Sequence, residues 1–373
     1  MDIQMVDLLG QYEKIKSEID EQIDQVIRSS VFVKGGKVNE FEANLRGYLK
    51  VGHVIACGNG TDALQLALMA LGLNEGDEVI TSPFTFVSTL EVLALMKLKP
   101  VLADIDPHSF NIRPELIQNC ITDRTKAIIP VHLYGQCADM ESICEIASKN
   151  GLFVIEDACQ ALGTDYLYKD GQVAKAGTIG DIACNSFFPT KNLGAFGDGG
   201  ALFTNDDELA RQMRSIANHG MSKRYYYQQI GMNSRLDAIQ AAILDVKLNY
   251  LDQFVEARQA AAAFYDKELA GISQLSIPAR VSYSTHSFHQ YTIKVWQKRD
   301  ELQKHLHSKG IPSMIYYPLP LHLQEAYHYM GYKKGVFPVS EELSQQVLSL
   351  PMHTELTEEQ LSYITSAIHE YFS

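Results

Sequence analysis

Apolar and polar positions along the first two thirds of the chain follow two alternating patterns. Between about residues 52 and 205, short apolar runs alternate with longer segments whose apolar residues recur at helical spacing. This alternation is typical of a parallel sheet flanked by helices, in one large α/β domain. The predicted strands are 54–57, 78–81, 99–104, 126–132, 152–156, 181–187 and 200–204. The predicted helices are 62–71, 87–96, 114–120, 139–150 and 206–219.

The pattern changes past about residue 240, where a second, smaller α/β unit is expected. It predicts one long helix over 236–269, and then a strand, a helix, a second strand and a terminal helix over 288–296, 299–309, 312–317 and 358–372. A chain of 373 residues is long enough for two domains. We therefore predict a large domain over 1–240 and a small C-terminal domain over 241–373.

Composition and charge narrow the class of protein. The formal net charge of -13 argues against nucleic-acid binding, because phosphate backbones need clustered Lys and Arg. The first ten residues carry acids where a signal peptide would carry lysines, and no apolar run is long enough to span a bilayer. We expect a cytoplasmic enzyme that binds neither membrane nor nucleic acid.

Cysteine and histidine spacing gives no sign of a metal site. The six cysteines are scattered without a C-x-x-C pair, which favours buried, structural thiols. Two histidine pairs, His286/His289 and His305/His307, have no cysteine or carboxylate at ligand spacing. They are expected to be ordinary surface or pocket residues.

Three segments place reactive side chains where predicted strands end. In the first, Gly58 and Gly60 permit a tight turn before a helix that opens at Thr61 or Asp62. Free N–H groups and the helix dipole suit a phosphate there, although ordinary N-capping explains the residues equally well. In the second, a strand runs into Glu156 and Asp157, either of which could instead cap or pair with a neighbour.

The third segment, residues 185–200, holds one lysine in a turn rich in Gly and Pro after an apolar strand. An amine in a partly dry pocket has a lowered pKa and can form a Schiff base, and Ser186 is close enough to share the pocket. Lys191 thus joins a phosphate cradle and a carboxylate at one sheet edge. Pyridoxal 5'-phosphate (PLP) needs these three groups, since an acid must keep its pyridine nitrogen protonated.

The same segments resemble the sugar aminotransferases of the DegT/DnrJ/EryC1/StrS family, and the resemblance extends over nearly the whole chain. It rests on GTDAL at 60–64, IEDA at 155–158, SFFPTKNLG at 186–194, DID at 104–106, IIPVHLYGQ at 128–136, GMNSRLDAIQA at 231–241, YYPLPLH at 316–322 and LSLPM at 348–352. It implies PLP fold type I, like aspartate aminotransferase, in a homodimer whose active sites lie at the subunit interface.

The resemblance also implies a role for each matching residue. Lys191 matches the lysine that binds PLP, Asp157 the acid at the pyridine nitrogen, and Gln160 the residue near the phenolic oxygen. The phosphate cradle matches the Gly60–Thr61 turn, the backbone amide of Asp62, Ser186 and, from the neighbouring subunit, Asn233.

Further positions match residues that contact the pyridine ring or the nucleotide sugar. Phe86 matches the aromatic residue stacked on the ring, although on its pattern alone it would be a core residue. Arg235, Tyr316 and Tyr317 match positions that reach the nucleotide sugar, partly across the interface. Many relatives have His where this chain has Tyr316.

The implied activity is transfer of an amino group from glutamate to a keto sugar of a nucleoside diphosphate, with the pyridoxamine form of the cofactor between the half-reactions. The blocks at 132–139 and 317–322 favour a 3-keto UDP- or dTDP-sugar, for amino-sugar and polysaccharide biosynthesis. The alternatives are a 4-keto sugar, a dehydratase, although dehydratases of the family replace the lysine with histidine, and a catalytically idle regulator. A Rossmann dehydrogenase is disfavoured because the first turn lacks the third glycine of the fingerprint.

Overall fold

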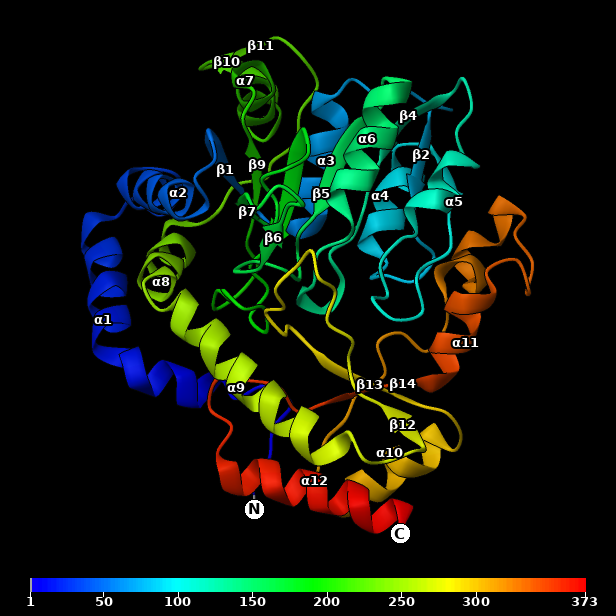
Figure 1. Cartoon of the computed structure of the whole chain (residues 1–373). Helices are drawn as coiled ribbons and strands as arrows, with labels where there is room; N and C mark the ends of the chain where they lie inside the picture. Colours follow the sequence, from blue (N-terminus) through cyan, green and yellow to red (C-terminus); the bar gives the residue numbers. More distant parts are fainter. Residues whose placement is uncertain (1) are drawn as a thin grey trace.

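A seven-stranded sheet forms the centre of the computed structural model, which describes residues 2–373 (Figure 1). Its strands lie in the order β1-β9-β8-β5-β4-β2-β3, and all are mutually parallel except β9, which runs antiparallel to β1 and β8. All seven predicted strands are confirmed. They are β1 (His53–Cys57), β2 (Glu78–Thr81), β3 (Lys99–Leu102), β4 (Thr125–Ile128), β5 (Phe153–Asp157), β8 (Ile182–Ser186) and β9 (Gly200–Thr204).

Helices cover both faces of this sheet, which explains its nearly continuous apolar strands. On β5, Ile155 packs in a core with α3 (Gly60–Ala70), α4 (Ser88–Leu95) and α7 (Asp207–Ile216). The adjacent Val154 points to the opposite face and packs with α5 (Pro114–Gln118) and α6 (Met140–Asn150). Farther along that face, α2 (Gly36–Leu49) and α8 (Ala238–Leu248) cover β1 and β9.

A separate core lies around a three-stranded antiparallel sheet at the bottom of Figure 1. Ile3 packs into this core with residues from the last third of the chain. The proposed division at residue 240 stays a prediction. The elements of this part are α9 (Leu251–Leu269), β12 (Leu275–Ser276), β13 (Tyr291–Val295), α10 (Arg299–Ser308), α11 (Pro338–Gln346), β14 (Val347–Leu350) and α12 (Glu358–Phe372).

Two predictions for this part are wrong. The expected single helix over 236–269 is divided at Asn249 and Tyr250, because α8 packs on the large core whereas α9 turns away to cover the small sheet. The expected strand over 312–317 pairs with the sheet at one residue, Met314, opposite Ser349 on β14. Tyr316 and Tyr317, at the end of this segment, line the cavity described below. The third strand of the small sheet is instead β14.

The remaining elements are short or peripheral. They are α1 (Leu8–Ser29), η1 (Leu133–Gly135), β6 (Asp165–Leu167), β7 (Val173–Lys175), β10 (Met221–Lys223), β11 (Tyr226–Tyr227), η2 (Leu321–Leu323) and η3 (Glu325–Met330). Across residues 2–373, no helix combines the length and the apolar character needed to cross a bilayer.

Candidate active site

A cavity of about 670 Å³ opens where the parallel strands of the large sheet end. This edge is where open α/β sheets bind ligands, because strand ends and helix N-termini converge there. Asp157 is the last residue of β5 and Ser186 the last residue of β8. The predicted residues that line the cavity are Gly60, Thr61, Phe86, Asp157, Gln160, Ser186, Lys191, Tyr316 and Tyr317.

The N-terminus of α3 forms one wall of the cavity. A Cβ atom on Gly60 would lie 2.8 Å from Cβ of Ser186, so glycine is required for this close approach. The Thr61 hydroxyl is hydrogen-bonded to that of Ser88, at 2.7 Å. Asp62 lies outside the lining, and its amide donates to the side chain of Asn59, which caps the helix. The first turn of α3 still directs its positive dipole end at the cavity.

The two acids at the end of β5 separate because successive strand residues point to opposite faces. Asp157 faces the cavity and is 5% exposed. Its Oδ2 accepts a hydrogen bond from the Thr89 hydroxyl at 2.8 Å, and its Oδ1 accepts one from the amide of Cys159 at 3.2 Å. These donors fix the direction of the carboxylate. Thr89 was not predicted from the sequence, because a threonine at the start of a helix usually serves as a cap.

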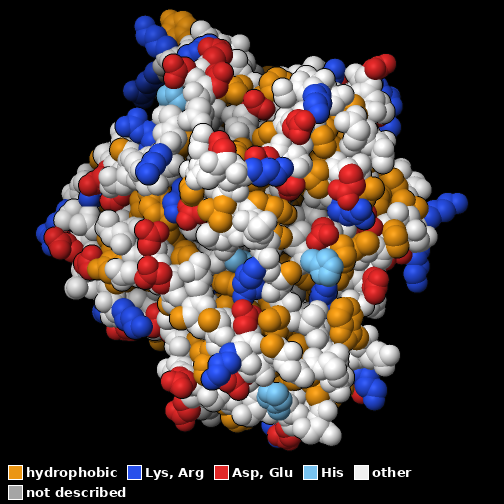
Figure 2. Space-filling view, in the orientation of Figure 1, with side chains coloured by type: hydrophobic (Ala, Val, Ile, Leu, Met, Phe, Trp, Pro, Cys, Tyr) orange, Lys and Arg blue, Asp and Glu red, His pale blue; other side chains and the backbone are white. Residues whose placement is uncertain are grey.

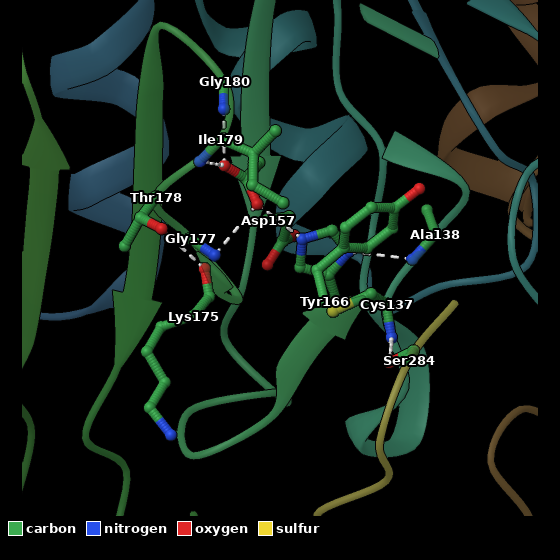
Figure 3. A network of polar contacts seen from close by, with 12 residues as sticks. Cys137, Ala138, Asp157, Tyr166, Lys175, Gly177, Thr178, Ile179, Gly180 and Ser284 are labelled. Atoms are coloured by element: carbon green, nitrogen blue, oxygen red, sulfur yellow. Dashed lines mark hydrogen bonds and ion pairs between the residues drawn. The ribbon is translucent and has the colours of Figure 1, made fainter. Parts of the chain in front are cut away.

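Glu156 is buried outside the cavity lining and is hydrogen-bonded to the loop that carries Gly177, Ile179 and Gly180, which are labelled in Figure 3. Its carboxylate accepts from the amides of Gly177, Ile179 and Gly180 and from Nε2 of His132. Burial opposes its ionisation, but the hydrogen bonds from His132 and the loop amides outweigh burial and lower the pKa of Glu156. Glu156 therefore pairs with its neighbours, which is one of the roles that the sequence left open for the two acids at this strand end.

Lys191 lies in a loop, residues 187–199, between β8 and β9. The side chain is partly reachable through the cavity, and the protein packed around it lowers the pKa of Lys191, against the opposing influence of Cys159 and Asp157. A lowered pKa leaves more of the amine uncharged and nucleophilic.

Aromatic residues and an amide form the rest of the cavity wall. Phe86 is 55% exposed and faces the cavity, so the alternative that it belongs to the core is wrong. The Phe86 ring lies 6.5 Å from that of Tyr317, centroid to centroid. The Gln160 side chain donates to the Tyr317 hydroxyl at 3.2 Å and accepts from the amide of Tyr134 at 2.8 Å.

Besides Asp62, two predicted residues lie outside the lining of this cavity. Asn233 pairs with Asn218 in an isolated bridge, and Arg235 donates to the Asn218 side chain at 3.2 Å. Arg235 lines a second, open depression of about 340 Å³, whose other basic residues are Lys34, Lys223 and Arg224. We call these four side chains the basic group. In Figure 2, Lys and Arg side chains project around the β10–β11 hairpin at the top.

A histidine and a cysteine also line the cavity. His289 is buried and lines the cavity, and burial lowers its pKa well below the usual value. All six cysteines are free thiols, and Cys159 lines the cavity. Among residues 2–373, no three His, Cys, Asp or Glu side chains gather as ligands for a metal ion.

Comparison with known proteins is consistent with the geometry. The model of the DegT/DnrJ/EryC1/StrS aminotransferase family matches residues 13–369. The chain is 50% identical to the pleiotropic regulatory protein of Geobacillus stearothermophilus over 374 residues, covering 100% of this chain and 99% of that protein. It is 44% identical to UDP-2-acetamido-2-deoxy-3-oxo-D-glucuronate aminotransferase of Pseudomonas aeruginosa over 366 residues, covering 98% and 99%.

A solved structure extends the similarity to the fold. The chain superposes on S. venezuelae DesV in complex with a ketimine intermediate with a TM-score of 0.96 and 37% identity, covering 100% of this chain and 99% of that one. The predicted aminotransferase-like α/β fold is confirmed.

Proposed function

Because the chain belongs to the DegT/DnrJ/EryC1/StrS aminotransferase family, we propose that it is a PLP-dependent aminotransferase acting on a nucleotide sugar. It transfers an amino group from glutamate to a keto sugar linked to UDP or dTDP. The observation that carries this proposal is the meeting of Lys191, Asp157 and the N-terminus of α3 in one cavity.

The residues present fit PLP. The Gly60 position, which a Cβ would fill, lets the Thr61 turn and Ser186 approach a phosphate closely. Asp157 suits a protonated ring nitrogen, Phe86 offers a ring face, and Gln160 would lie near the phenolic oxygen. When bound, PLP supplies an electron sink for the charge left by a departing Cα proton.

The chain's own groups would bind the reactants and move the protons. The Lys191 amine takes the Cα proton of glutamate in the first half-reaction and returns a proton to the sugar carbon in the second. Its lowered pKa suits both roles. Asp157 is held in a fixed direction throughout by the Thr89 hydroxyl and the Cys159 amide.

The active site needs a second copy of the chain. Within residues 2–373, Lys191 is the one Lys or Arg that lines the cavity, yet a nucleotide sugar and glutamate both carry negative charge. The basic group lies elsewhere, in a depression that is also lined by Val33, an apolar residue that is 50% exposed. A homodimer would bury these residues and bring Arg235, with Asn233, to the partner's cavity.

Subunit complementation tests this sharing. Lys191→Ala and Arg235→Ala chains, each inactive alone, are mixed under conditions that exchange subunits. A shared site predicts that activity returns, because the mixed dimer has one site with both residues intact. Activity that stays absent although mixed dimers form would show that Arg235 serves its own subunit.

A substrate panel tests the reaction. The purified protein is given glutamate with 3-keto and 4-keto UDP- and dTDP-sugars, and amino-sugar and 2-oxoglutarate formation are measured. We expect turnover of 3-keto sugars, as the name of the Pseudomonas aeruginosa relative indicates for that protein. Turnover of 4-keto sugars alone would establish the alternative substrate class, and loss of a sugar hydroxyl without glutamate would establish a dehydratase.

A catalytically idle regulator is the alternative from another class, and one relative is named as a regulatory protein. The cavity of this chain nevertheless keeps Lys191, Asp157 and the Gly60 turn together. Glutamate-dependent bleaching of the bound cofactor's visible absorption separates the two, because an idle protein would leave the band unchanged. We also expect the enzyme to act in the cytoplasm.

A further inference from the structure

Lys247 on α8 is a buried ammonium group that the reaction does not use. Its side chain is 1% exposed, and within residues 2–373 no carboxylate lies at ion-pair distance from Nζ. Burial lowers the pKa of Lys247 to about 8. Removing an ammonium group from water without an acidic partner is unfavourable, so packing alone does not explain a lysine here.

The Lys247 ammonium group contacts the loop that carries Lys191. Nζ donates to the Gly194 carbonyl at 2.8 Å and lies 4.8 Å from the centroid of the Phe196 ring. The ring face provides a second favourable interaction for the cation. Lys247 therefore binds the loop through a backbone oxygen and an aromatic side chain, both within residues 187–199.

The loop transmits this contact toward Lys191. A Cβ on Gly194 would lie 2.2 Å from the Pro189 carbonyl oxygen, so the two backbone segments are pressed together. Pro189 is two residues before Lys191, whose amide donates to the Phe188 carbonyl at 2.8 Å. A displacement of Gly194 would consequently reach the backbone of Lys191 through direct contacts.

A second residue of α8 holds the same loop. Gln240 precedes Lys247 by seven residues, about two helical turns, so both side chains project from one face. The Gln240 side-chain oxygen accepts from the Phe196 amide at 2.8 Å, and its nitrogen donates to the Phe196 carbonyl at 3.4 Å. The loop is thus fixed to α8 at two points.

We propose that Lys247 and Gln240 are positioning residues that hold loop 187–199 against α8, so that the Lys191 amine occupies the same place in both half-reactions. The inference rests on the proposed function of Lys191. It adds that α8, outside the cavity, sets the geometry of that amine.

A pair of matched variants separates positioning from mere packing. Lys247→Met keeps an unbranched side chain that is one atom shorter, and removes the charge and the donor. Lys294→Met on β13 is the control, since Lys294 is 7% exposed and donates to the Pro107 carbonyl at 2.8 Å in the same manner, but contacts no residue of loop 187–199.

Hydrogen–deuterium exchange on the full chain, with and without PLP, is the first measurement. We expect peptides covering 187–199 to exchange faster in Lys247→Met and at the wild-type rate in Lys294→Met. In the holoenzyme, the kcat of Lys247→Met should fall about 10- to 100-fold, as for a reacting group misplaced by a fraction of an ångström to one ångström, with KM for glutamate nearly unchanged. Lys247→Arg should recover part of the loss.

Wild-type exchange and kcat in Lys247→Met would overturn the proposal. If Lys247→Met does not fold, Gln240→Ala takes its place, with the same expected exchange and the same refuting result. The wild-type protein is assayed beside the variants. Failure of the wild type to bind PLP or consume glutamate would refute the proposed function, whereas wild-type turnover with unaffected variants would refute only the role of α8.

Discussion

Replacing Glu156, which precedes Asp157 on β5, by Gln should destabilise the fold, because the Glu156 carboxylate accepts four buried hydrogen bonds. Oε1 accepts from the amides of Ile179 and Gly180, both at 2.6 Å, and Oε2 from the Gly177 amide at 2.9 Å and His132 Nε2 at 2.8 Å. Nδ1 of His132 accepts from the backbone, so its Nε2 must be the donor. Glutamine offers one oxygen, and its NH₂ group would face two of these donors. Each unsatisfied buried donor costs about 1–3 kcal/mol, or about 2–6 kcal/mol in total.

Urea unfolding at pH 7, followed by circular dichroism, measures this loss. Glu145→Gln is the control, because its ion pair with Lys149 is exposed and should contribute little to stability. The pKa of Glu156 is lowered in the folded state, so its stabilisation is complete above the usual carboxyl pKa and is lost as pH falls. The difference in the free energy of unfolding between wild type and Glu156→Gln should therefore decrease in acid. A difference below about 1 kcal/mol at pH 7 would show that the hydrogen bonds of Glu156 do not stabilise the fold as proposed.

The other substitutions act on the cavity itself. Asp157→Asn should slow both half-reactions at least about 100-fold with little change in melting temperature, and full activity would remove Asp157 from the mechanism. Thr89→Val deprives Asp157 Oδ2 of its side-chain donor and should reduce kcat about 10-fold; unchanged kinetics would show that Thr89 does not orient the acid. Gly60→Ala places a Cβ 2.8 Å from that of Ser186 and should weaken PLP binding about 10-fold or more in a spectroscopic titration, whereas unaltered affinity would contradict the proposed phosphate cradle.

The large sheet was predictable because each strand is buried on both faces and therefore reads as a short apolar run. Val154 and Ile155 show this directly, since they are adjacent and enter different cores. The two wrong predictions concern segments whose structure is set by tertiary packing. No local residue marks the division at Asn249 and Tyr250, and 312–317 has strand-like composition although Tyr316 and Tyr317 turn into the cavity.

The site was predictable where the chemistry is concentrated in one segment. Lys191 stands in a distinctive loop, and the strand end supplied two acids, although the choice of Asp157 over Glu156 came from the family resemblance. Thr89 and Lys247 were not recognisable, because a helical threonine and a helical lysine have no local signature. Their partners lie 68 and 53 residues away in the sequence, and the fold brings them together.

Borohydride reduction of the purified protein, followed by peptide mass mapping, tests whether Lys191 carries the cofactor. We expect the reduced cofactor to be attached to the peptide containing Lys191, and Lys191→Ala to carry none. Attachment to another lysine, or a folded wild-type protein that retains no cofactor when supplied with PLP, would show that Lys191 is not the PLP-binding lysine of this protein.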